Sequence, residues 1–151
     1  MYRYFYVTIL VAKSMTLGSA IPLGSIGSRV ITVTEEHTAP FVGSGRVRVL
    51  ATPVMINLFE AAALEAIEHL LPEGHQSLGT HLNVSHTAAT PVGMRVTATA
   101  EVIAVEGRVV RFKVSARDER DLIGEGLHDR VIVNVAKFVL RVQEKIAACK
   151  K

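Results

Sequence analysis

A carboxylate and a histidine occupy positions that should face apolar surface, an arrangement suited to proton transfer. Glu60 lies in the run Val-Met-Ile-Asn-Leu-Phe-Glu-Ala-Ala-Ala-Leu-Glu, where apolar residues surround it on nearly every side. At about 100° per residue, Glu60 lies about 140° around a helix from Glu65, away from the wet edge that Glu65 and Glu68 can form. A carboxyl group in such a place can act as a general base or nucleophile near neutral pH. The alternative is a partly exposed glutamate, or one paired with an arginine for structure.

A histidine downstream of this helix has the strand parity of two apolar residues. His86 alternates in step with Leu82 and Val84, so all three should face the same side of a strand. If the helix packs on that side, His86 and Glu60 meet. The alternative is a core histidine whose ring is satisfied by a backbone carbonyl. No pair of histidines has the spacing of a metal motif such as His-Glu-x-x-His, and we expect no metal site.

Three more residues have both a chemical and a structural interpretation. Thr52 lies about two helical turns before Glu60, where it either caps the helix or helps to position a carboxylate or water. Gly79 would let a ligand approach the backbone closely, and its N–H could then polarise a carbonyl of that ligand. The alternative is that Gly79 marks a bulge in the strand. Arg130 is either a solvated strand charge or an anion clamp.

Length, charge and composition exclude several classes of protein. The 151 residues suit one domain with a real core, and the net charge is only +3. Aromatic residues make up 5% and tryptophan is absent, so we expect no nucleic-acid partner. Cys149 is the only cysteine, which excludes an intrachain disulfide and a zinc site built on cysteines.

The first twenty residues predict an N-terminal extension, with a single domain over residues 21–151. The apolar run 4–12 follows Arg3 and precedes Lys13, a weak likeness to a signal peptide, and it is too short to span a bilayer. Met15 is an alternative start. No other segment is a candidate for a membrane span, and we expect a cytoplasmic protein with no membrane partner.

The remaining pattern predicts an α+β protein. Residues 17–45 are rich in Gly, Ser and Pro, interrupted by a strand over 29–34, and 47–51 is a short extended piece. A long helix over 54–71 begins at Thr52-Pro53 and ends at Pro72-Glu73-Gly74. Alternating strands follow, with a hairpin at Glu106-Gly107, a last long strand over 122–135 and a short amphipathic helix over 136–150. One long helix followed by an antiparallel meander indicates a hot-dog arrangement, in which the sheet wraps the helix.

These residues together resemble the fluoroacetyl-CoA thioesterase group of hot-dog proteins, over a segment from Thr52 to about Val142. The resemblance is densest in five strings: Ser77-Leu78-Gly79-Thr80, His86-Thr87-Ala88-Ala89-Thr90-Pro91, Val105-Glu106-Gly107-Arg108, Val114-Ser115-Ala116 and His128-Asp129-Arg130. It implies that Thr52, Glu60 and His86 are catalytic and that Gly79 and Arg130 contact the substrate. It also implies an acyl-CoA substrate, with coenzyme A as part of that substrate and no separate cofactor.

One departure from the family concerns the lid over the acyl pocket. The fluoroacetyl-specific enzyme carries a Phe-rich segment before the threonine. Here the corresponding segment, 40–48, is shorter, Phe41 is its only aromatic residue, and Arg46 stands about where a lid phenylalanine should be. The resemblance therefore implies thioester hydrolysis without implying selectivity for fluorine.

The expected activity is hydrolysis of a small acyl-CoA thioester. Glu60 either activates water or attacks the thioester carbonyl directly, His86 orients the reacting groups, and Thr52 hydrogen-bonds to Glu60. An acyl-thioester hydratase or dehydratase and a non-catalytic acyl-CoA-binding protein are the alternatives, because the fold alone does not decide. A helix that is apolar on almost every face predicts at least a homodimer, and in the family the active site lies at a subunit interface.

Overall fold

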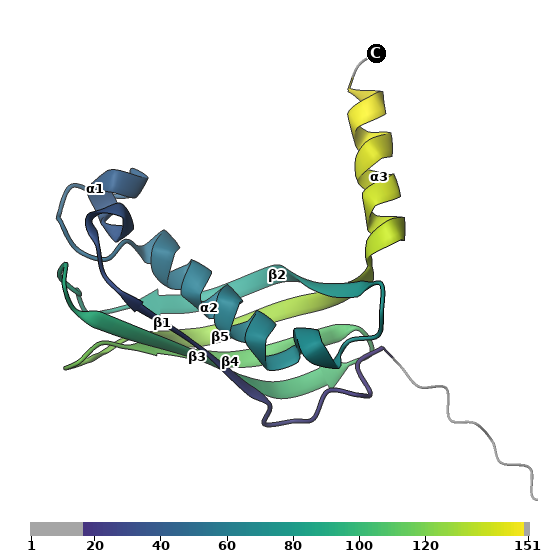
Figure 1. Ribbon diagram of the computed structural model, residues 1–151, viewed down its shortest axis with the longest axis horizontal. Coiled ribbons are helices and arrows are strands. Elements are labelled where there is room, and N and C mark those ends of the chain that lie inside the picture. The colour runs from purple at the N-terminus through teal and green to yellow at the C-terminus, as the bar shows by residue number, and fades with distance from the viewer. Residues whose placement is uncertain (1–16, 150–151) are drawn as a thin grey trace, which may run out of the picture.

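A curled antiparallel sheet wraps one long helix in the computed structural model, which describes residues 17–149 (Figure 1). The strands are β1 (Ile26–Thr32), β2 (His75–His86), β3 (Arg95–Glu106), β4 (Val109–Arg117) and β5 (Leu122–Asn134). The α-helices are α1 (Ala39–Val42), α2 (Thr52–Ile67) and α3 (Val135–Ala148), with single 3₁₀ turns at Glu35–His37 and Glu68–Leu70.

The five strands form one sheet in the order β1-β3-β4-β5-β2, and every neighbouring pair is antiparallel. The hairpin between β3 and β4 turns at Gly107, whose φ of 62° is the left-handed conformation that glycine adopts without strain. Within the described part of the chain, β2 and β1 are the two edges of the sheet, and each pairs on one side only. The predicted hairpin and the last long strand are both confirmed.

Helix α2 lies on the concave face of the sheet and leans toward one half of it. It packs mainly on β1 and β3 and makes few contacts with β5 and β2. A Cβ on Gly27 of β1 would collide with the carbonyl oxygen of Ala62 and lie 2.5 Å from the amide nitrogen of Ala66. The close packing of helix on strand therefore depends on small residues. On its other side, α2 leaves the β5–β2 half of the concave face more open.

The segment between β1 and α2 is more structured than its Gly, Ser and Pro content predicts. It contains the short helix α1, whose C-cap is Gly43 with a φ of 79°. The predicted extended piece over 47–51 forms only isolated bridges, from Leu50 to Thr38 and from Val49 to Pro91. This segment is thus bridged to itself through Thr38 and to the turn before β3 through Pro91, rather than being a free loop.

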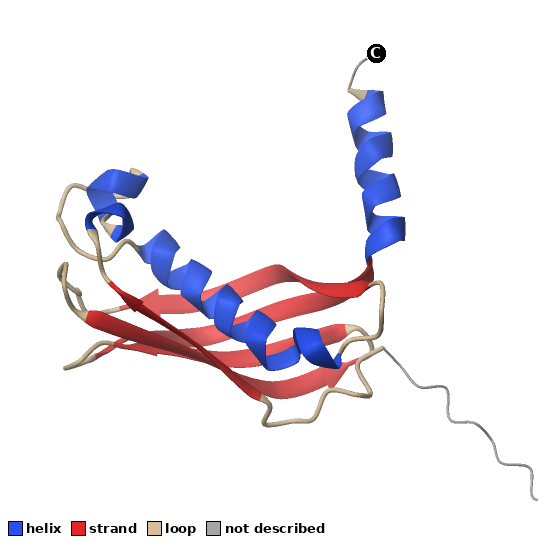
Figure 2. Ribbon diagram, viewed as in Figure 1, coloured by secondary structure: helices blue, strands red, loops and turns tan. Residues whose placement is uncertain are grey.

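The last helix, α3, stands away from the sheet (Figure 2). Its N-cap is Asn134, whose side chain accepts a hydrogen bond from the amide of Lys137 at 3.1 Å. None of its residues is buried, and its few contacts with the sheet are to β5. Its apolar side chains recur along one face at intervals of three and four residues: Val135, Phe138, Val139, Val142 and Ile146.

The predicted α+β hot-dog architecture is confirmed, with boundary differences of a few residues. Strand β1 begins and ends earlier than the predicted 29–34. Helix α2 ends at Ile67, and the 3₁₀ turn at Glu68–Leu70 occupies the rest of the predicted helix. Met15 and the apolar run 4–12 lie outside the described residues, so the expectations about the N-terminal extension stay predictions.

Candidate active site

The predicted carboxylate lies over the backbone of β2 and beside a buried arginine. A Cβ on Gly79 would collide with Oε1 of Glu60, and Nη1 of Arg130 lies 3.9 Å from the same oxygen. The burial expected for Glu60 is wrong for the single chain, because 43% of its side chain is exposed. The cause is the lean of α2 toward β1, which leaves Glu60 facing the more open half of the sheet.

Gly79 combines the two interpretations that its sequence allowed. The register of β2 against β5 shifts between Gly79 and His81, so the predicted bulge is present. Gly79 is also exposed, and the absence of a side chain there is what admits the carboxylate of Glu60. A ligand can therefore approach the backbone at this point. The polarisation of a carbonyl by the Gly79 N–H stays a prediction.

Arg130 is buried rather than solvated, so the interpretation as a solvated strand charge is wrong. It is 4% exposed and pairs with Gly79 across the β2–β5 ladder. Its Nε donates to Oγ of Ser77 at 2.8 Å, and its Nη2 donates to the carbonyl oxygen of Ser77 at 2.8 Å. Burial lowers the pKa of Arg130 while Glu60 and Glu68 raise it, and a guanidinium remains charged throughout the ordinary pH range.

Three residues of this cluster were missed by the sequence interpretation. Oε1 of Glu68 accepts hydrogen bonds from the amide of Ser77 at 2.8 Å and from its hydroxyl at 2.5 Å. His128 is fully buried and lies 3.4 Å from Nη1 of Arg130 through its Nε2. The signal was present in the spacing, because Ser77 and His128 each lie two residues before Gly79 and Arg130 and so share their face of the sheet.

Thr52 and His86 form a second cluster at the beginning of α2. Oγ1 of Thr52 lies 2.8 Å from Nδ1 of His86, which confirms that His86 faces the helix. Thr52 is the first residue of α2 and Ala51 is its N-cap, so the predicted capping role is wrong and the hydroxyl is free to pair with the imidazole. In the single chain its partner is His86 and not Glu60, contrary to the hydrogen bond expected for it.

The imidazole of His86 is satisfied on one side only. Its Nε2 is buried and has no hydrogen-bond partner among residues 17–149. Burial lowers the pKa of His86, and the polar backbone of Ala88 opposes that effect. A neutral imidazole that accepts a hydrogen bond from the Thr52 hydroxyl at Nδ1 carries its proton on Nε2. The Nε2–H can then donate a hydrogen bond to a ligand or a second chain.

The two clusters are separated along the helix. Thr52 and Glu60 lie eight residues apart on α2, a rise of about 12 Å. Each cluster is close to a hollow, and the two hollows have volumes of about 700 and 290 Å³. The larger is lined by Ala61, Glu65, Glu68, Gln76, Ser77 and Arg130, and the smaller by Ala39, Ser44, Leu50, Thr52, His86 and Ala88.

Other chemical and membrane features are few in residues 17–149. No three His, Cys, Asp or Glu side chains gather there in a way that could hold a metal ion. No helix in that range is long and apolar enough to cross a membrane. Cys149 is exposed just after the end of α3, far along the chain from both clusters.

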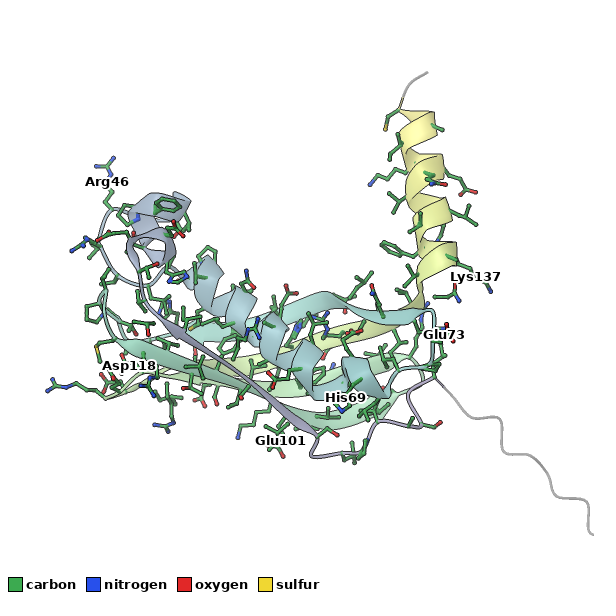
Figure 3. All side chains as sticks on the ribbon, viewed as in Figure 1. Arg46, His69, Glu73, Glu101, Asp118 and Lys137 are labelled. Carbon is green, nitrogen blue, oxygen red and sulfur yellow. The ribbon has the colours of Figure 1, made fainter. Side chains whose placement is uncertain are left out.

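The segment before α2, residues 40–48, is where the sequence departs from the Phe-rich lid of the family. Phe41 is 66% exposed, so it does not bury its ring against the smaller hollow. Arg46 projects outward from the loop after α1 (Figure 3). Ala39 and Ser44 are the members of this segment that line the hollow. No aromatic side chain of the described segment therefore covers Thr52 and His86 in the single chain.

Comparison with known proteins identifies the family of this chain. Residues 33–136 match the model of the fluoroacetyl-CoA-specific thioesterase family. A fluoroacetyl-CoA thioesterase from Streptantibioticus cattleyicolor is 46% identical over 100 residues, which cover 66% of this chain and 72% of that protein.

Solved structures give the same result. A structure of the fluoroacetyl-CoA thioesterase FlK superposes with a TM-score of 0.78 at 37% identity, covering 82% of this chain and 96% of that one. A Thermus thermophilus protein described as a thioesterase superfamily member gives a TM-score of 0.77 at 34% identity, covering 85% and 97% of the two chains. On the matched span and on the shared hot-dog architecture, this chain belongs to the fluoroacetyl-CoA-specific thioesterase family.

Proposed function

We propose that the protein hydrolyses small acyl-CoA thioesters, with Glu60 as the acting carboxylate. The observation that carries this proposal is the position of Glu60, held over the exposed backbone of Gly79 beside the buried charge of Arg130. A carboxylate so placed has a cation beside it and an open side for substrate. Similarity to fluoroacetyl-CoA thioesterases supports the choice of a thioester as substrate.

The reaction needs only water and the side chains of the site. In one route Glu60 takes a proton from water, the oxygen of that water attacks the thioester carbonyl, and the coenzyme A thiolate leaves and is then protonated. In the other route Glu60 attacks the carbonyl and expels the coenzyme A thiolate, which is then protonated, to form an anhydride; water cleaves this anhydride to the free acid and regenerates the Glu60 carboxylate. The Gly79 N–H donates a hydrogen bond to the carbonyl oxygen as that oxygen gains negative charge, and the positive charge of Arg130 lies nearby. Coenzyme A enters as part of the substrate, and no further cofactor is required.

We propose that the working form is a homodimer joined along the free edge of β2. Two observations support a second chain. The outer edge of β2 has no partner strand in the described chain, and unpaired edges favour association with another strand. His86 has a buried Nε2 without a partner, while Thr52 and Glu60 lie about 12 Å apart on α2. Antiparallel pairing of two β2 strands would bring His86 of one copy toward the Glu60 half of the other.

The acyl group fits the smaller hollow, beside Thr52 and His86. A volume of about 290 Å³ suits an acyl chain of a few carbons. Because Phe41 is exposed and Arg46 points outward, we propose hydrolysis of small acyl groups in general, without selectivity for fluoroacetyl. We propose a cytoplasmic location, because acyl-CoA esters are intracellular metabolites.

A thiol-release assay tests this function. Acetyl-, fluoroacetyl-, medium-chain and aromatic acyl-CoA are compared, with Glu60→Gln as the test variant and Glu65→Gln as its matched control on the same helix. We expect Glu60→Gln to lower kcat by about 10² to 10⁴-fold and Glu65→Gln to leave it unchanged. Equal turnover by Glu60→Gln would contradict the assignment. Consumption of the double bond of an enoyl-CoA without thiol release would instead indicate a hydratase, and tight binding without turnover would indicate a binding protein.

A further inference from the structure

Arg130 is fixed by hydrogen bonds that leave one of its nitrogens directed at Glu60. Its Nε and Nη2 both donate to Ser77, to the hydroxyl and the carbonyl oxygen at 2.8 Å each. The remaining nitrogen, Nη1, lies 3.9 Å from Oε1 of Glu60 and 3.4 Å from Nε2 of His128. A planar guanidinium held at two nitrogens cannot rotate, so the direction of the third is set.

The Ser77 hydroxyl can accept a hydrogen bond from Arg130 because it donates its own proton in a hydrogen bond to Glu68. The Ser77 hydroxyl donates to Oε1 of Glu68 at 2.5 Å, and the same oxygen accepts from the Ser77 amide at 2.8 Å. The lone pairs of Oγ then face Nε of Arg130. The chain of donors runs in one direction, from the guanidinium through the hydroxyl to the carboxylate, and bonds in such chains strengthen one another.

His128 limits the guanidinium on its other side. Its Nδ1 lies 3.0 Å from the carbonyl oxygen of His81, which can only accept, so the proton is on Nδ1 and Nε2 has a free lone pair. Burial lowers the pKa of His128, and the charge of Arg130 lowers it as well, so the ring is neutral at neutral pH. The ring stacks with Phe112 at a centroid distance of 6.1 Å, which holds its plane.

We infer that Ser77 and His128 are positioning residues, which hold the Arg130 guanidinium in the orientation that keeps its charge beside the Glu60 carboxylate. The inference rests on the function proposed for Glu60, and it extends the site to residues that lie behind it. A cation fixed before the reaction stabilises the carboxylate without reorganisation during turnover. Glu68 completes the arrangement through Ser77.

Two substitutions remove one support each. Ser77→Ala removes the hydroxyl between Glu68 and Arg130, and His128→Phe removes the lone pair while keeping an apolar ring beside Phe112. His128→Gln is the conservative variant, since its amide can donate to the His81 carbonyl and accept from Arg130. Glu65→Gln is the matched control, because Glu65 lines the larger hollow and makes no side-chain hydrogen bond with the described residues.

The separate effects on kcat and KM, together with rescue by the conservative variant, distinguish positioning from a merely structural role. With the thioester that the wild type hydrolyses fastest, we expect Ser77→Ala and His128→Phe to lower kcat by about 10- to 100-fold with little change in KM. His128→Gln should recover most of the rate, and Glu65→Gln should match the wild type. An unchanged kcat in Ser77→Ala, or a loss in His128→Gln as large as in His128→Phe, would overturn the inference.

A second measurement separates this inference from the proposed function. In protein labelled with ¹⁵N at arginine, the side-chain signals of Arg130 are assigned by their loss in Arg130→Lys and followed without substrate. Because Ser77 holds Nε and Nη2, we expect the guanidinium of Arg130 to rotate faster in Ser77→Ala than in the wild type, and equal rates would overturn the inference even if the enzyme is active. Absence of Glu60-dependent thiol release would defeat the proposed function while this measurement still decides the role of Ser77. If His128→Phe does not fold, the results for Ser77→Ala and His128→Gln decide whether the inference holds.

Discussion

Replacing Gly79 by alanine should separate activity from stability. The added Cβ would collide with Oε1 of Glu60 and lie 3.1 Å from Cε1 of His128. Gly79 does not have a left-handed φ, so the backbone itself accepts alanine without strain. The larger conflict is between the methyl group and the carboxylate of Glu60, which can move because 43% of its side chain is exposed, while the tight contact with the buried His128 ring is a smaller one.

The magnitude follows from how far Glu60 must retreat. To reach ordinary van der Waals separation, its carboxylate must move by roughly 1 Å, away from both Gly79 and Arg130. A displacement of that size in a reacting group costs about 10²-fold in rate. The substitution also reduces the entropy of the unfolded chain, which favours the folded state by about 0.4–1 kcal/mol and offsets the cost of moving Glu60. We expect a variant that unfolds near the wild-type temperature and is nearly inactive.

Thiol release and thermal unfolding are measured on Gly79→Ala, with Asn83→Ala as the control on an exposed position of the same strand. The double variant with Glu60→Ala removes the conflict, so Gly79→Ala should be more stabilising in that background than in the wild type. A kcat/KM for Gly79→Ala within a factor of about 2 of the wild type would refute the placement of the carboxylate over this glycine.

Further expectations concern the second cluster and the effect of pH. Thr52→Val removes the hydroxyl that pairs with His86 and should lower kcat by about 10-fold or more, whereas Thr52→Ser should retain most of the rate, as steady-state kinetics would show. Burial lowers the pKa of His86 and His128, so as the pH falls these two imidazoles are protonated in the unfolded chain before they are protonated in the folded protein. Stability should be full above about pH 6.5 and fall as the pH drops below it, which calorimetry across pH 5–8 would reveal. Arg111 holds the pKa of Asp129 below its usual range, so the stability from that pair is present above about pH 4 and lost below it. Asp129→Asn should flatten the acid end of a melting-temperature profile, and an unchanged profile would contradict this.

The fold was predictable from the sequence because its signals are local. The helix start at Thr52-Pro53, the turn at Gly107 and the alternation of the strands each depend on neighbouring residues. The short helix α1 was missed because glycine, serine and proline in its surroundings outweigh four residues of helix.

The candidate site was predictable in its residue types but not in its grouping. Parity placed His86 on the helix side of β2, and that is where it lies. Whether Thr52 pairs with His86 or with Glu60 depends on how far α2 leans across the sheet, a tertiary property that no local pattern contains. The burial of Arg130 depends in the same way on Ser77, which is far from it in sequence and meets it only through the pairing of β2 with β5.

The lean of α2 gives its two sides different tolerance to mutation. On the side that packs on β1, the backbone of Gly27 lies so close that Ala62 and Ala66 leave no room for larger neighbours. Changes there cost packing and should be removed by selection for folding alone. On the face that carries Glu65 and Glu68, the helix lines a hollow of about 700 Å³, so a residue such as Glu65 can vary without disturbing the core. Substitutions are therefore tolerated on one face of the helix while the other face keeps the fold unchanged.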